Sequence, residues 1–156
     1  MRSRVRAFAL VITILAAGSA SASASPAFGE LLTEGAFGLL GSAAGTAFSI
    51  AAVGQLTPLV SSPFVGTAVV VATLALGTGA GASAGVLVAG DILDLDARPL
   101  ACLSGGLLGG LVAAFAEPIL YLLGVPEAVA EFLGFALLPI LPAVGATVAL
   151  NLSLHP

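Results

Sequence analysis

Carboxylates that could hold a cation are clustered in one short segment. Asp91, Asp94 and Asp96 lie within six residues, and Arg98 follows them. Hard cations such as Ca²⁺ take oxygen ligands, so a weak cation site is one hypothesis. The spacing differs from that of an EF-hand loop, which needs a central glycine and a distal glutamate. We therefore interpret the segment as a solvated loop in which Arg98 partly balances the charge.

Two further acids, Glu117 and Glu131, flank a short link that contains Gly124 and Pro126. The link should place both carboxylates near one face of a membrane. Ionisable groups inside a membrane are functional candidates, and a pair could share a proton or hold a cation. The alternative, which we favour, is that both lie at head-group level and mark helix ends. Glu127 and Glu131 form a like-charge pair four residues apart, which favours a position in contact with water, where the repulsion is screened.

The residue types that catalysis requires are otherwise scarce. Cys102 is the one cysteine, which excludes an internal disulfide and a cysteine-based zinc site; we interpret it as a packing residue. His155 is the penultimate residue and is too isolated for catalysis or metal binding. Because no nucleophile–base pair, phosphate loop or metal cluster is recognisable, we expect neither an enzyme nor a cofactor or metal.

The composition indicates lipid as the solvent of this chain. Of 156 residues, 59% are hydrophobic and 8% are charged, whereas soluble domains carry about 25% charged residues. Too few charges remain to keep a soluble surface wetted, and disorder requires low hydrophobicity. The four basic residues are all arginines, and Arg98 is the only one after residue 6. A nucleic-acid partner is excluded, because it would require clustered Lys and Arg.

The N-terminus has the three parts of a secretory signal peptide. Arginines occupy positions 2, 4 and 6, an apolar stretch covers residues 5–17, and small residues fill 18–24. We expect cleavage after Ala24, with cleavage after Ala22 or an uncleaved anchor as alternatives. This predicts a signal peptide over 1–24, a short exported segment over 25–34, a helical membrane domain over 35–151 and a tail over 152–156. The expected location is the cell envelope, in the inner or cytoplasmic membrane.

Four apolar runs, without any Asp, Glu, Lys, Arg or His, cover residues 35–54, 64–90, 100–116 and 132–150. A span of about 30 Å needs about 20 apolar residues in a helix. Period-2 alternation, which is typical of outer-membrane strands, is absent. The sequence therefore predicts an all-α transmembrane bundle of about four helices.

Two of these runs leave alternatives open. Run 35–54 is rich in small residues and could be partly re-entrant, which would reverse the side on which loop 91–98 lies. With four crossings that loop lies outside, although the positive-inside rule prefers Arg98 inside. Pro139 and Pro142 interrupt the fourth run, so they either kink it for packing or build a gate or binding notch.

Glycines recur at four-residue intervals, which places them on one helix face. Such faces allow close helix contact in lipid, either within the chain or with a second copy. The glycines assigned to these packing faces are Gly41, Gly45, Gly77, Gly81, Gly85, Gly105, Gly106, Gly109 and Gly110. Thr73 and Ala89 extend the row on the second run. The spacing predicts glycine-zipper packing between helices.

The rows Gly77-x-x-x-Gly81-x-x-x-Gly85 and Gly106-x-x-x-Gly110 resemble the glycine-zipper segments of small bacterial envelope proteins. The stretch from Leu137 to Thr147, with Asn151 beyond it, is similar to the C-terminal segment of uncharacterised exported, glycine-rich membrane proteins of bacteria. The resemblance implies a helical envelope protein and assigns no catalytic residue.

The favoured function is that of a structural or scaffolding helix bundle assembled through glycine-rich faces. Its expected partners are membrane lipid and either a second copy of the chain or another membrane protein. A small channel or carrier, gated by Glu117 or Glu131, is the second hypothesis. The third is an accessory subunit of a larger membrane complex.

Overall fold

The computed structural model describes residues 26–154, which form four α-helices and one short 3₁₀ helix. The elements are α2 (Pro26–Leu56), η1 (Thr57–Leu59), α3 (Pro63–Ile92), α4 (Pro99–Leu122) and α5 (Glu127–Leu154). Residues 26–154 contain no strand, so the prediction of an all-α fold is confirmed. The predicted signal peptide over 1–24 and His155 lie outside the described residues.

All four α-helices are long and apolar enough to cross a membrane. They contain 24 to 31 residues, or about 36–47 Å at about 1.5 Å per residue. The hydrocarbon core of a bilayer is about 30 Å thick. The run for which a re-entrant segment was the alternative, 35–54, belongs to the unbroken helix α2. This helix lacks the interruption that a re-entrant segment requires.

The helices extend beyond the apolar runs from which they were predicted. Helix α2 begins at Pro26, so most of the segment expected to precede the membrane domain is helical. Helix α4 continues through Pro118 to Leu122, and α5 continues through Pro139 and Pro142. The reason is that backbone hydrogen bonding sustains a helix whatever the polarity of its side chains. Charged residues therefore end an apolar run without ending the helix.

The link between α4 and α5 has the geometry that its sequence indicates. Gly124 has a φ of 80°, and its amide donates to the carbonyl of Tyr121. A left-handed residue after the last helical turn is the usual position of a helix-ending glycine. Helix α4 therefore ends at this link, and α5 begins at Glu127.

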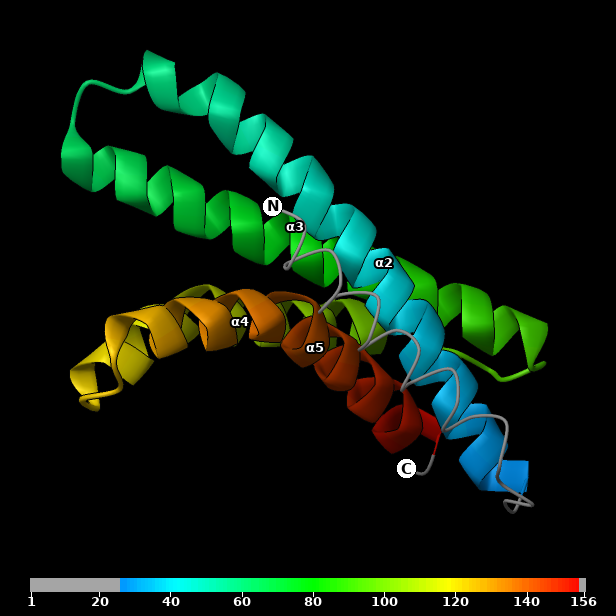
Figure 1. The fold of residues 1–156 in the computed structure, drawn as a ribbon. Helices are drawn as coiled ribbons and strands as arrows, with labels where there is room; N and C mark the ends of the chain where they lie inside the picture. The colour runs from blue at the N-terminus through cyan, green and yellow to red at the C-terminus, as the bar shows by residue number, and fades with distance from the viewer. Residues whose placement is uncertain (1–25, 155–156) are drawn as a thin grey trace, which may run out of the picture.

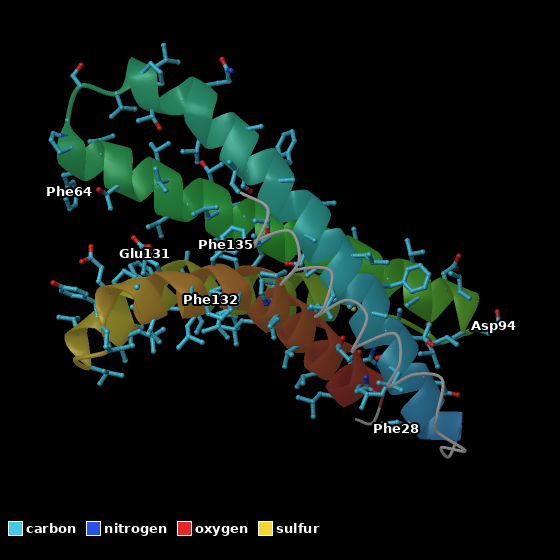
Figure 2. All side chains as sticks on the ribbon, in the orientation of Figure 1. Phe28, Phe64, Asp94, Glu131, Phe132 and Phe135 are labelled. Atoms are coloured by element: carbon cyan, nitrogen blue, oxygen red, sulfur yellow. The ribbon has the colours of Figure 1, made fainter. Side chains whose placement is uncertain are left out.

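The helices form two antiparallel hairpins, α2 with α3 and α4 with α5 (Figure 1). The hairpins contact each other through α3 and α4 and through α2 and α5. They diverge toward the end that carries links 57–62 and 123–126, at the left of Figure 1. The link over 93–98 lies at the opposite end, and Figure 2 shows Asp94 and Phe28 there, far from Phe64 and Glu131.

Small residues dominate the interior of the bundle. A cluster of fully buried side chains comprises Ala82, Val86, Cys102, Ala146 and Leu150, from α3, α4 and α5. Leu95 and Ala97 from the link over 93–98 pack against it, so this link covers the cluster that joins the hairpins.

Candidate functional site

Helices α2 and α3 approach each other to backbone contact. A Cβ placed on Gly41 would overlap the carbonyl oxygen of Gly81, and one on Gly45 would overlap that of Gly77. The relation is reciprocal at Gly81, where a Cβ would overlap the carbonyl oxygen of Gly41. The glycines of α3 therefore meet a helix of the same chain.

The two glycine rows of α4 face different helices. On the first row, a Cβ on Gly106 would lie 2.5 Å from the carbonyl oxygen of Gly79, and one on Gly110 would overlap that of Ala75. Both neighbours belong to α3. This row therefore forms the α3–α4 part of the contact between the two hairpins.

The second row of α4 packs within its own hairpin. A Cβ on Gly105 would overlap the carbonyl oxygen of Gly145, and one on Gly109 would overlap that of Leu141. Both neighbours belong to α5. Helix α4 thus lies between α3 and α5, with one row of glycines toward each.

Serine hydroxyls add hydrogen bonds across the same contacts. Ser49 Oγ donates to the carbonyl of Thr73 over 2.9 Å, which joins α2 to α3. Ser83 Oγ lies 2.7 Å from the carbonyl oxygen of Gly79 in α3 and 2.9 Å from that of Cys102 in α4, so its single hydrogen is shared between the two helices. Hydrogen bonds between membrane helices contribute about 0.6 kcal/mol each on average, so they supplement the packing without dominating it.

The large apolar side chains lie mostly on the outside of the bundle. Phe48 is 73% exposed and Phe64 83%. Other exposed examples are Leu40, Leu76, Leu100, Leu108, Val112, Leu122, Phe132 and Phe135. The outer surface is therefore chemically suited to lipid.

A buried carboxylic acid, Glu34 of α2, lies in the contact with α5. It is 1% exposed, and Asn151 Nδ2 donates to its Oε2 over 2.7 Å. The same Nδ2 lies 2.9 Å from the carbonyl oxygen of Thr147, one turn earlier in α5. This polar pair, within two candidate spans, is the clearest candidate for chemistry in the described part of the chain.

Sequence reasoning missed Glu34 because it treated the first acid before an apolar run as the end of the membrane segment. The four-residue spacing of Glu34, Gly38 and Ser42 was the available signal, since it places all three on one face of α2. All three are buried. The lone amide of Asn151 near the end of the last run was a second signal.

Pro142 accounts for another polar contact on this seam. Proline has no amide hydrogen, so the carbonyl of Leu138, four residues earlier, lacks its helical donor. Ser42 Oγ lies 3.5 Å from that carbonyl oxygen. Because α5 is continuous through both prolines, the contact favours a role in packing over a break in the helix.

The two acids singled out from the sequence lie on the surface near the diverging end. Glu117 and Glu131 are both exposed, and no hydrogen bond or ion pair joins these two described residues. The side chain of Glu117 packs over Gly134, where an added Cβ would lie 2.7 Å from Glu117 Cβ. Glu117 also lines a partly open hollow of about 110 Å³ between α3, α4 and α5.

The acidic link carries no converging ligands. Asp91, Asp94 and Asp96 are exposed, and Asp94 has a positive φ of 54°. Within residues 26–154, no three His, Cys, Asp or Glu side chains are placed to hold a metal ion. This arrangement favours the solvated loop over the cation site. Cys102 is a free, buried thiol.

Comparison of the chain with protein-family models, with curated proteins and with solved structures gives no match.

Proposed function

We propose that the protein is an integral membrane protein with a structural role, a four-helix scaffold held together in lipid by glycine-zipper packing. The supporting observation is that a Cβ on Gly41, Gly45, Gly105 or Gly109 would overlap a carbonyl oxygen of the neighbouring helix. Apolar side chains do not drive helices together in lipid, because lipid tails are equally apolar. Close backbone packing is then a main source of association.

The N-terminal sequence supports a place in the cell envelope. We expect residues 1–24 to direct export and to be removed, which the mass of the protein recovered from membranes would measure. The resemblance to exported glycine-rich bacterial membrane proteins agrees with this location.

Extraction of membranes tests the proposal as a whole. The full chain should remain in the membrane pellet in alkaline carbonate and should require detergent to dissolve. A protein that enters the carbonate supernatant and runs as one monodisperse species without detergent would refute it.

A small channel or carrier is the second candidate, and the hollow beside Glu117 is the observation in its favour. Purified protein in liposomes should then carry cations, and Glu117→Gln should lose that flux, with Glu127→Gln as the matched control. Flux no greater than that of empty vesicles removes this candidate and leaves the scaffold.

A second copy of the chain would have to use a surface other than the central glycines. The rows on α3 and α4 are covered by helices of the same chain. The exposed apolar side chains of the outer surface therefore offer the area for a homo-oligomer or for a larger membrane partner. Cross-linking in native membranes separates the two, since it captures dimers in one case and a different protein in the other.

A further inference from the structure

Glu34 is buried without a basic partner. Its side chain is 1% exposed inside the candidate span Phe28–Leu59. Arg98, the one basic residue in the described range 26–154, is exposed. An isolated ionised carboxylate is costly to bury. The charge of this carboxylate therefore has to be neutralised by something other than a described side chain.

The register of α2 and α5 brings an additional oxygen to the same level. A Cβ on Gly38 would lie 3.3 Å from Ala143 Cβ, so these two residues face each other. The helices are antiparallel (Figure 1), and one turn further toward the 93–98 end lie Glu34 on α2 and Thr147 on α5. Asn151, one more turn along α5, reaches back to Glu34.

The hydroxyl of Thr147 is buried without any hydrogen-bond partner. Elsewhere in this chain, Thr46 and Thr78 donate to the carbonyl four residues earlier, over 2.8 and 2.7 Å. Thr147 does not, although its residue is only 6% exposed. Leaving a buried polar group unsatisfied costs about 1–3 kcal/mol, so an orphaned hydroxyl at the level of a buried carboxylate indicates a missing partner.

We propose that Glu34, Thr147 and Asn151 form an intramembrane binding site for one monovalent metal cation, with Na⁺ as the ion tested. A carboxylate and a hydroxyl supply oxygen ligands of the kind that a hard cation takes, and the Asn151 amide, which donates to Glu34, holds the carboxylate in place. One positive charge balances the single carboxylate, whereas a divalent ion would leave an excess charge buried.

Among the described residues, the remaining surroundings of Glu34 supply no competing positive charge. Glu30 is the other titratable group on α2, and Cys102 on α4 is a buried, uncharged thiol. Helix α3 up to residue 90 and α5 over 132–154 contain no ionisable side chain. The site does not depend on the scaffold role, since the same residues could serve a carrier.

A hydrophobic carbodiimide, which modifies protonated carboxyls in apolar surroundings, tests the site on the full chain in detergent. Labelling of Glu34 is followed by mass spectrometry in NaCl and in choline chloride of equal ionic strength, across a range of pH. The exposed Glu131 serves as an internal reference, and Glu131→Gln is the matched control variant. Thermal unfolding, read from exposure of the single buried thiol of Cys102, is measured alongside.

If Na⁺ is the ligand, Na⁺ at ten times its dissociation constant should slow labelling of Glu34 about ten-fold. It should also raise Tm, and Glu34→Gln should lose that increase. Thr147→Val should lose most of the protection, and full protection in that variant would overturn the three-residue site. Labelling that ignores Na⁺ and only falls as pH rises would overturn the proposal, because any single carboxyl titrates in this way. The proposal is also overturned if wild type and Glu34→Gln show the same dependence of Tm on Na⁺.

Discussion

Replacing Gly41 by alanine tests whether the absence of a side chain holds α2 against α3. An added Cβ at this position would overlap the carbonyl oxygen of Gly81 and lie 3.1 Å from the amide nitrogen of Gly85. Both obstacles are backbone atoms of a helix, which cannot rotate away as a side chain can. The two helices would have to separate.

Gly35 is the matched control on the same helix. A Cβ there meets nothing within 4 Å, and both glycines are interior positions of α2. Alanine is favoured over glycine in a helix interior by about 1 kcal/mol. Gly35→Ala should therefore leave the protein as stable as wild type or make it more stable.

The comparison of the two variants isolates the packing contribution. The gain in helix propensity is common to both and cancels in the difference. What remains is the cost of overpacking at Gly41, about 1–3 kcal/mol. Gly41→Ala should thus unfold at a lower temperature than Gly35→Ala, and at or below the temperature of wild type.

Cys102 supplies the assay without any added label. It is the only cysteine and is fully buried, so a dye that becomes fluorescent on reaction with thiols reports unfolding during a temperature ramp in detergent. Equal shifts of Tm in Gly41→Ala and Gly35→Ala would refute the reasoning, because the contact with Gly81 would then have no measurable effect.

Three further predictions concern other parts of the fold. Gly81→Leu should abolish the thermal unfolding transition or lower its Tm far more than Gly66→Leu does, because Gly66 has open space around it whereas Gly81 faces a backbone carbonyl. Similar transitions in the two variants would contradict the expectation. Gly124→Ala should destabilise the protein by about 1–2 kcal/mol, the cost of a left-handed conformation for a residue with a side chain, and an unchanged Tm in the same assay would count against it. Asp94→Cys and Ser61→Cys should react with a membrane-impermeant thiol reagent from opposite sides of sealed vesicles, since the structure places their links at opposite ends of the bundle; labelling from one side would exclude four crossings.

The sequence was sufficient to locate the helices because a segment that crosses a bilayer must satisfy its own backbone hydrogen bonds. Apolar runs that satisfy a bilayer must be helical, and Gly124 with Pro126 separates two of them clearly. The limits of the helices could not be predicted in the same way. Glu34 and Glu117 ended apolar runs but lie inside helices, because the backbone hydrogen bonds continue past them.

The partners of each glycine row lay beyond sequence reasoning. A four-residue spacing places Gly106 and Gly110 on one face, but nothing in that spacing distinguishes α3 from α5 or from a second chain. The order of the helices around the bundle decides it, and this depends on all the contacts together. The buried Glu34–Asn151 pair was missed for a related reason, because the two residues are 117 positions apart.

The interior of this bundle reverses the arrangement familiar from soluble proteins. Alanines such as Ala82, Ala89 and Ala146 are fully buried, whereas Phe48 and Leu122 are largely exposed. Bulky side chains inside would hold the helices apart, and in lipid they gain little by leaving the surface. Stability must then come from contacts that a single added methyl group would break. An interior built in this way has little tolerance for a polar group that lacks a hydrogen-bond or charge partner. A buried carboxylate and an unpartnered hydroxyl at one level of the α2–α5 seam are therefore costly features, and a bound cation would offset that cost.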